Sequence, residues 1–587
     1  MKLLYNRHGR ISAAIVHAAS NPSWLFRWST LLFFFTAVLF VVNAFHETYP
    51  DEFDNILGGW YLLHGKLLYS SYFTHHGPIP YVIGAFITLF SGQSFVYFRV
   101  LYAIFLLGVV FGTYFLLRRR VGVRETNFFL LFMVFLGIES TYYWAHMLLA
   151  DNVAAFSFLP VFALLLIKTL HKRKIELTDV GIISVLSAIG LYSSLTYAYL
   201  YIILSVSTLY LYYRHTYNRK LFLIKMLAYP LVLFALPHLL FLLYLLVTGT
   251  LNDYMYQNFT FNTSYYIYNY PRPEGSTQIN PIRYAVVIAN DFVNNYYTLL
   301  IGIKSFDFVF PVNATMAVSN AAFFIYTVLR KRYKLAVFFV AILVYTNVRS
   351  NPLVSKETDY QSAVYVMVSF FTLFLFLTEL YRSLNLTKHF SKKAIYTALL
   401  LIVGIYAFFT SFFFILKFVH KFYPKYMGSA PLIYDRPKIA PVINAITNKD
   451  DYVWIGPFEF EELFYTNAKV PTKYQILIGG IGKSEKLRQE MLMQLNQNKP
   501  KVIYFDKNFV YLFSPAHSYS KFFMDFLKEN YVTLYGYTVN NVHYSSVAPI
   551  HVNEKMDIET KLYIRKDVVS EVIDKLLKSN YIRASHN

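Results

Sequence analysis

Residues 28–45 read WSTLLFFFTAVLFVVNAF, an uncharged apolar run close to the length at which a helix crosses the hydrocarbon core of a bilayer. Directly afterwards the chain becomes acidic, with three carboxylates in the stretch YPDEFD at residues 49–54. Carboxylates just outside a membrane span are available to something at the membrane surface. The opening of the chain therefore predicts a membrane protein with polar chemistry at one face of the bilayer.

The composition is that of a protein with many membrane spans. Of its 587 residues, 56% are hydrophobic and only 15% are charged, which is too apolar for a soluble protein. The chain is also too long to be a single membrane hairpin. The net charge of +21 does not indicate nucleic acid, because the Lys and Arg residues lie in short clusters between apolar runs. Since the chain has no cysteine, disulfides, thiolate metal sites and cysteine nucleophiles are excluded.

Eleven apolar segments are predicted to span the membrane, and the first of them is expected to act as the targeting signal. If the N-terminus is cytoplasmic, the basic clusters between Arg118 and Lys393 all fall on the cytoplasmic side. Residues 79–91 are apolar but too few to span comfortably, so we expect a re-entrant or interfacial segment on the outer face. The predicted spans are 28–46, 97–117, 126–139, 152–170, 178–193, 196–213, 226–248, 312–329, 335–347, 361–380 and 395–417.

Two domains are predicted. Residues 1–417 form a polytopic α-helical membrane domain with an outer acidic loop at 47–96, and residues 418–587 form a C-terminal extracytoplasmic α/β domain. The expected location is the plasma membrane of a bacterium or archaeon, with the N-terminus inside and the C-terminal domain outside. The clearest elements of the second domain are buried strands at 452–455 and 501–505 and helices at 484–495 and 568–577.

The acidic stretch is predicted to begin a helix. Apolar residues recur at helical spacing over 51–64, which is typical of an amphipathic helix lying in the membrane interface. Asp51 and Glu52 fall in its first turn, where they either carry chemistry or complement the positive end of the helix dipole. Asp54, one turn further on, is expected to be solvated.

A turn with two imidazoles follows this helix, at Thr74-His75-His76-Gly77-Pro78. Neighbouring side chains rarely face one metal ion without further ligands. We therefore expect His75 and His76 to hydrogen-bond an anionic or hydroxyl-rich substrate. A bound divalent cation is left open, and no other cofactor is indicated.

A second polar group lies at the outer ends of the third and fourth predicted spans, with Glu139, His146 and Asp151-Asn152. Asp151 begins a span, where it either caps the helix or serves a function, since an ionisable group is costly if it enters the membrane.

Outer basic residues form a third set of candidates. Arg99 stands near the outer start of the second span, and Arg349 belongs to an outer loop that ends at Tyr360. These cations could bind a phosphate group of a substrate. The equally simple alternative is that they anchor the protein at the membrane interface. The neighbouring outer loop contains N-glycosylation patterns at Asn258 and Asn262, which matter only in a host with that machinery.

These motifs, in this order, resemble the GT-C superfamily of polyprenyl-phosphate-sugar-dependent membrane glycosyltransferases. The similarity is to bacterial relatives of protein O-mannosyltransferases and the lipid A aminoarabinose transferase, and it is clearest over residues 28–200. Two features depart from the family: Gly77-Pro78 stands where relatives often have two prolines, and residues 190–196 lack a lysine that many relatives carry. The resemblance is carried by Asp51-Glu52, Gly65 with Tyr69, His75-His76-Gly77-Pro78, Arg99 and Ala150-Asp151-Asn152.

The resemblance implies a GT-C-like fold and a transfer reaction. A sugar would move, with inversion, from a polyprenyl-phosphate donor to a lipid, glycan or protein acceptor on the outer face, with Asp51 as general base. Glu52 would be its neighbour, and Asp151 would help to shape the site. The expected substrate-binding residues are Tyr69, His75, His76, Arg99, Glu139, His146, Arg349 and Tyr360.

Two other functions stay open. A transporter or flippase for a lipid-linked saccharide would also need many spans, but it favours ionisable residues near the bilayer midplane and repeated halves, and no internal repeat is visible. A non-catalytic membrane scaffold would use the acids as interfacial anchors. It leaves unexplained why acids, histidines and arginines recur on one side.

Overall fold

A computed structural model describes most of the chain. It covers residues 22–45, 48–120, 145–216, 222–266, 310–346, 360–383, 437–511, 514–537, 542–547 and 557–586, with short pieces between 129–137 and 282–293. Contacts between Cα atoms divide the chain into two compact units. The helical unit comprises 1–47, 99–239 and 281–433, and the α/β unit comprises 48–98, 240–280 and 434–587.

Five described helices are long and apolar enough to cross a membrane, which indicates a membrane protein. Four other predicted spans coincide with shorter apolar helices, and the spans at 126–139 and 395–417 lie largely or wholly outside the described residues. The five long helices are α5 (Phe95–Arg120), α7 (Ala150–Leu170), α9 (Ala198–Thr216), α10 (Phe222–Val247) and α16 (Ala363–Ser383). The shorter apolar stretches are Thr30–Asn43 of α2 (Pro22–Asn43), the whole of α8 (Leu177–Ser193), Val318–Leu329 of α14 (Phe310–Leu329) and the whole of α15 (Tyr333–Thr346).

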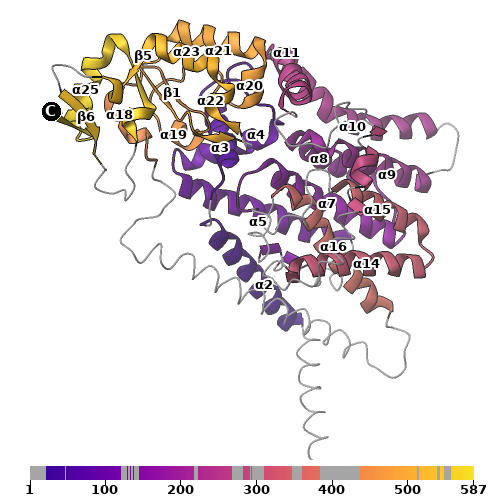
Figure 1. The fold of residues 1–587 in the computed structure, drawn as a ribbon. Coiled ribbons are helices and arrows are strands. Elements are labelled where there is room, and N and C mark those ends of the chain that lie inside the picture. Colours follow the sequence, from indigo (N-terminus) through magenta and orange to yellow (C-terminus); the bar gives the residue numbers. More distant parts are fainter. Residues whose placement is uncertain are drawn as a thin grey trace, which may run out of the picture. The chain divides into compact units, whose positions relative to one another are not determined.

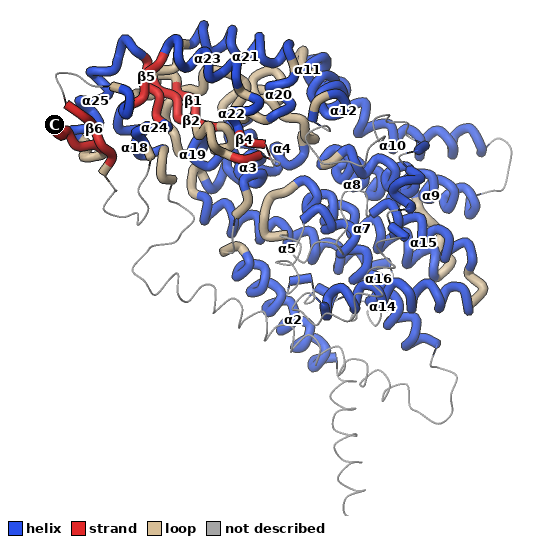
Figure 2. The backbone as a smooth tube through the Cα atoms, in the orientation of Figure 1, coloured by secondary structure: helices blue, strands red, loops and turns tan. Residues whose placement is uncertain are grey.

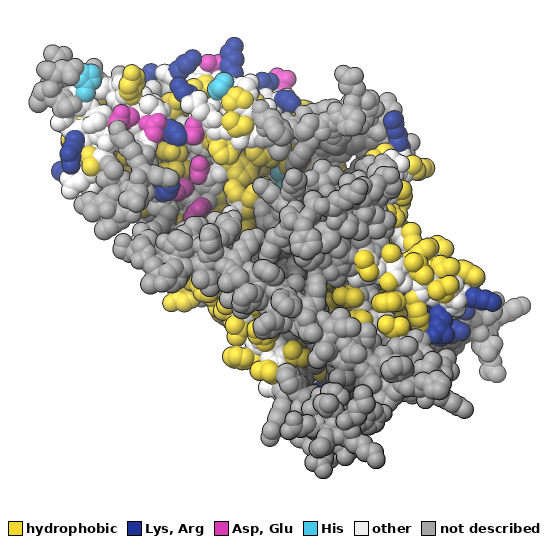
Figure 3. Space-filling model, turned by 60° about the horizontal axis from the view of Figure 1, so that its bottom comes forward, with side chains coloured by type: hydrophobic (Ala, Val, Ile, Leu, Met, Phe, Trp, Pro, Cys, Tyr) yellow, Lys and Arg dark blue, Asp and Glu magenta, His cyan; other side chains and the backbone are white. Residues whose placement is uncertain are grey.

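Helix α7 forms the centre of the helical unit. It packs against α8 and α16, and α16 packs against α14, so these four helices follow one another side by side (Figure 1). Asn320 of α14 joins α16 through hydrogen bonds to Ser369 and Thr372, at 3.0 and 2.8 Å. Large apolar side chains stay exposed on other helices, and Figure 3 shows such side chains gathered in broad patches, one of them bordered by Lys and Arg. Apolar helix faces with basic borders are typical of lipid contact.

The α/β unit contains a four-stranded mixed sheet, drawn in red in Figure 2. Strands β1 (Val453–Gly456) and β2 (Val502–Phe505) pair in parallel and are buried at every position. Parallel strands covered on both faces are continuous apolar runs, which is why the sequence predicted both of them. Strand β7 (Leu562–Arg565) pairs antiparallel with β2, and β5 (Tyr531–Thr533) pairs antiparallel with β7.

Short helices and two small ribbons surround this sheet. The predicted helices at 484–495 and 568–577 are confirmed as α21 (Glu485–Asn498) and α25 (Val569–Lys578). The ribbons pair β3 (Val510–Tyr511) with β4 (Ser514–Pro515) and β6 (Val542–Ser546) with β8 (Ile582–His586). The helices are α18 (Ala440–Ile446), α19 (Phe460–Phe464), α20 (Gly479–Lys483), α21 (Glu485–Asn498), α22 (Ala516–Tyr519), α23 (Lys521–Asn530), α24 (Ile558–Lys561) and α25 (Val569–Lys578).

Residues 48–98 are joined to this C-terminal fold. They contain helix α3 (Pro50–Leu63) and helix α4 (Ile79–Ser91), which pack closely together and bring α3 against α19. The Phe53 ring lies 6.3 Å from the Phe464 ring, and Gln93 donates a hydrogen bond to the Phe464 carbonyl at 2.8 Å. The acidic segment is thus part of the same folded body as the sheet.

The contact between α3 and α4 depends on a glycine. A Cβ atom at Gly59 would lie 2.4 Å from the backbone nitrogen of Ala85, a distance that backbone atoms cannot relieve without moving the helices apart. We expect Gly59→Ala to destabilise the α/β unit by about 1–3 kcal/mol and to lower the thermal unfolding midpoint of the purified chain. Gly108→Ala is the control, because nothing lies within 4 Å of that position. Equal midpoints for the two variants would contradict this packing.

Candidate functional site

The acidic stretch forms the first turn of α3, as predicted, with Pro50 as the first helical residue. Asp51 is partly exposed, whereas Glu52 is 0% exposed and its carboxylate accepts a hydrogen bond from the Thr48 hydroxyl at 3.4 Å. Asn55 donates to the Asp51 carbonyl at 3.0 Å. Most of α3 is buried within the α/β unit. Of the two acids in this turn, Asp51 is therefore the one whose side chain reaches the surface.

Asp54 corrects an expectation. It is only 8% exposed, not solvated, and its carboxylate accepts hydrogen bonds from two buried tyrosines. The Tyr72 hydroxyl donates to Oδ1, and the Tyr81 hydroxyl donates to Oδ2 at 2.6 Å. While Asp54 is ionised, the Tyr81 hydroxyl donates to it, so the Thr74 hydroxyl, 2.6 Å away, donates to Tyr81. These bonds connect α3, the following loop and α4.

The environment of Asp54 changes its acidity. Burial raises the pKa of its carboxyl group from 3.8 to about 7, and the negative charge of Asp51 acts in the same direction. The two tyrosine hydroxyls oppose the shift, since they donate to the ionised form. Sequence spacing gave no signal of this site, because Tyr72 and Tyr81 return to Asp54 from 18 and 27 residues further along the chain.

The loop that carries Tyr69, His75 and His76 is held in an unusual shape. Tyr69 has φ +72°, which is rare for a bulky residue, and its hydroxyl donates to the His76 carbonyl at 3.3 Å. The His75 ring lies 4.0 Å from the His76 ring and 4.3 Å from the Tyr266 ring. The structure therefore brings together three of the predicted substrate-binding residues in one loop.

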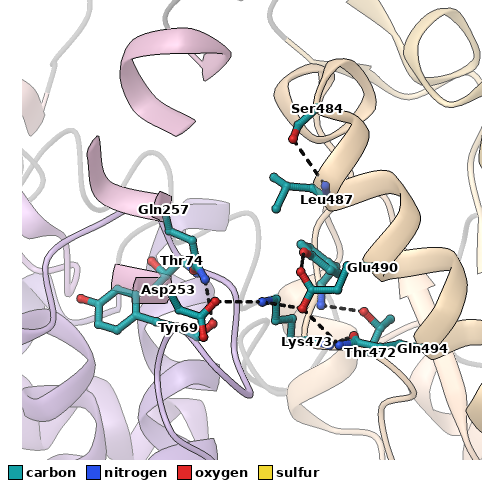
Figure 4. A network of polar contacts seen from close by, with 11 residues as sticks. Tyr69, Thr74, Asp253, Gln257, Thr472, Lys473, Ser484, Leu487, Glu490 and Gln494 are labelled. Carbon is teal, nitrogen blue, oxygen red and sulfur yellow. Dashed lines mark hydrogen bonds and ion pairs between the residues drawn. The ribbon is translucent and has the colours of Figure 1, made fainter. Parts of the chain in front are cut away.

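Residues distant in the sequence also form hydrogen bonds with this loop. The sequence did not predict these contacts. Gln257 donates to the Tyr69 carbonyl at 2.7 Å and accepts from the Thr74 amide at 3.0 Å (Figure 4). Next to it, the Lys473 side chain is only 5% exposed and lies 2.7 Å from Glu490 and 3.6 Å from Asp253. The Lys473 carbonyl also accepts from the Phe73 amide at 2.8 Å.

The remaining described candidates belong to the helical unit. Asp151 is buried in the first turn of α7, and Tyr197 donates to its Oδ1 at 2.7 Å. Arg99 is buried in α5 and donates to the Ala44 carbonyl at 3.2 Å. His146 is buried just before α7. A buried acid with a tyrosine donor at the start of an apolar helix fits either a structural or a functional role.

Some candidates lie outside the described residues. This applies to Glu139 and Arg349, and for Tyr360 the structure gives only the backbone, which begins the short helix Tyr360–Ser362. Across the described ranges, no three His, Asp or Glu side chains are grouped closely enough to hold a metal ion.

Comparison with known proteins adds no family. No protein-family model matches the sequence, and a comparison with curated proteins finds no match.

The raised pKa of Asp54 makes stability depend on pH. The folded state holds this proton up to about pH 7, while the unfolded chain loses it near 3.8, so the contribution is full below pH 4 and is lost as the pH rises through 7. The loss is on the order of 2–4 kcal/mol. We expect the thermal midpoint of the wild type to fall from pH 5 to pH 8, and Asp54→Asn to remove much of that fall.

Two variants serve as comparisons. Glu459 also has a pKa raised to about 7, mainly by burial, so Glu459→Gln should remove a separate share of the pH dependence. Asp525→Asn, at an exposed site on α23, should leave the dependence intact. The account of Asp54 is wrong if Asp54→Asn and Asp525→Asn show the same change between pH 5 and pH 8.

Proposed function

We propose that this protein is a membrane glycosyltransferase that moves a sugar from a polyprenyl-phosphate donor to an acceptor at the outer membrane face. The observation that carries the proposal is the start of α3, where Asp51 is partly exposed while Glu52 in the same turn and Asp54 in the next are buried and hydrogen-bonded. A general base works best when the scaffold fixes its position and leaves it within reach of the substrate. Asp51 meets both conditions.

The proposed reaction is a direct displacement. An acceptor hydroxyl attacks the anomeric carbon as Asp51 takes its proton, the new C–O bond forms, and the bond to the lipid phosphate breaks with its electrons on the phosphate. One displacement inverts the anomeric carbon. Glu52, which is 0% exposed, is proposed to position this turn rather than to touch substrate. Asp151 stays a proposed site-shaping residue, and Arg99 and Arg349 stay proposed partners of the departing phosphate.

The donor explains why such an enzyme would carry apolar helices. A polyprenyl tail stays in lipid, so its sugar arrives at the membrane surface, and the helical unit supplies helices long and apolar enough to reach across a bilayer. The predicted sidedness puts the acidic stretch and the C-terminal residues on the outer face. An outer acceptor then meets an outer base.

One observation favours the flippase alternative. His238, inside the apolar helix α10, lies 2.7 Å from the Tyr192 hydroxyl and 2.6 Å from the Tyr201 hydroxyl. An ionisable side chain within a membrane span is a functional candidate by default. If this group serves transport, His238→Phe abolishes the movement of lipid-linked sugar between leaflets and leaves sugar transfer unchanged.

The central test of the transferase is Asp51→Asn. Removal of a general base should lower the rate of sugar transfer by about 10²–10⁴-fold while the thermal midpoint stays unchanged, because Asp51 is partly exposed. Transfer is measured as release of polyprenyl phosphate from a panel of polyprenyl-phosphate sugars with purified protein. Asp525→Asn makes the same chemical change at an exposed site and should keep full activity. Wild-type turnover by Asp51→Asn would exclude Asp51 as the base.

A further inference from the structure

A π-helical turn sits against the loop that carries Tyr69 and His75. It spans Tyr256–Phe261, follows the short helix α11 (Leu251–Met255), and begins a few residues after the apolar helix α10. Such turns are rare and occur frequently at functional sites. In its second residue, Gln257, the side-chain nitrogen and the side-chain oxygen both form hydrogen bonds with the backbone of the loop. Gln257 therefore explains how the turn is attached but not why it is a π-helix.

The next residue, Asn258, has no such structural use. Its side chain is only 5% exposed, yet neither Nδ2 nor Oδ1 has a hydrogen-bond partner among the residues that the structure describes. It lies near enough to the Tyr69 hydroxyl to favour the ionised phenol, a pKa effect that burial outweighs, but not in hydrogen-bonding geometry with it. A buried amide without partners costs free energy, so its presence calls for an explanation.

A second unsatisfied group lies one helical turn further on. Asn262 donates from Nδ2 to the carbonyls of His75 and Asn258, at 2.9 and 3.0 Å. Its Oδ1 is buried and has no partner in the described part of the chain. Asn258 and Asn262 together offer one amide NH2 group, with two N–H donors, and two acceptor oxygens beside the histidine loop.

Aromatic residues flank these asparagines in the turn and in the histidine loop. The Tyr69 ring lies 5.1 Å from the Tyr254 ring, and the His75 ring lies 5.6 Å from the Phe261 ring. His75 and Asn262 are themselves partly exposed, so a ligand can approach from their side. A ligand that suits this site has hydroxyl groups that both donate and accept, and C–H faces that pack on rings. A sugar has both.

We propose that Asn258, together with Oδ1 of Asn262, binds the hydroxyl groups of a saccharide. This inference rests on the proposed glycosyltransferase function and adds a specificity-determining site to it. The saccharide is either the sugar of the polyprenyl-phosphate donor or a glycan acceptor. A site built to bond a hydroxyl discriminates strongly against a ligand that lacks it, because the buried amide is then left unpaired.

The competing explanation is an ordered water that bonds the amide and stabilises the fold. The two explanations differ in the ligand-free protein. If water satisfies Asn258, Asn258→Ala lowers the thermal midpoint, as Gln257→Ala should do by releasing the loop. If the amide is kept for a ligand, Asn258→Ala leaves the midpoint unchanged or raises it.

Binding to the full-length chain is measured by saturation-transfer NMR and native mass spectrometry. The probes are undecaprenyl-phosphate hexoses and pentoses, undecaprenyl phosphate without sugar, and methyl glycosides of the same sugars. The variants are Asn258→Ala and Asn258→Asp, which removes the amide donor at nearly constant shape. Asn252→Ala, at an exposed asparagine of α11, is the matched control.

We expect both Asn258 variants to bind a saccharide probe about tenfold more weakly or worse, with bare undecaprenyl phosphate and the Asn252→Ala control unaffected. Loss confined to the lipid-linked sugars identifies the donor, and loss confined to the methyl glycosides identifies the acceptor. The proposal is overturned if no sugar probe binds, if every probe binds both Asn258 variants as tightly as the wild type, or if Asn258→Ala lowers the ligand-free midpoint as much as Gln257→Ala.

The binding readout is independent of turnover. If the wild type transfers no sugar while saccharide binding still depends on Asn258, the transferase function fails and the binding site stands. If sugar transfer depends on Asp51 but saccharide binding does not depend on Asn258, the transferase function is supported and the proposed saccharide site is wrong.

Discussion

The carboxyl group of Asp54, held between the hydroxyls of Tyr72 and Tyr81, is the contact on which the arrangement of the acidic segment depends. A buried carboxyl group is costly unless hydrogen bonds compensate it, and here the donors come from the loop after α3 and from α4. All three elements must be in place for the bonds to form. The network therefore fixes the helix whose first turn presents Asp51 at its partly exposed end.

The same loop is held from its other side by residues distant in sequence. Gln257 bonds its backbone at Tyr69 and Thr74, and the carbonyl of the buried Lys473 accepts from Phe73. A loop fixed from two sides can keep Tyr69 in a left-handed conformation that would otherwise be unfavourable. Rigidity of this kind serves binding, because side chains that are already in position lose little freedom when a ligand arrives. The acidic helix and the histidine loop form one preorganised polar region of the α/β unit.

The sequence predicted those features that depend on local patterns. Apolar runs identified the long helices and the buried strands β1 and β2, and Pro50 with the acids identified the start of α3. It placed Asp54 in water, because helical spacing cannot show that two tyrosines fold back over that residue. Lys473 gave no local signal and Asn258 gave only a glycosylation pattern, because both residues contact segments roughly two hundred residues away in the chain. Distant pairing, rather than residue type, decides which polar groups are buried.

The central claim is that Asp51 activates an acceptor for direct attack on a lipid-linked sugar. The most direct measurement is the anomeric configuration of the transferred sugar, determined by proton NMR of the product formed by the purified protein from a polyprenyl-phosphate sugar of known configuration. A single displacement gives one product with the configuration inverted relative to the donor. Retention of configuration, or transfer from no donor in the panel, would contradict the account.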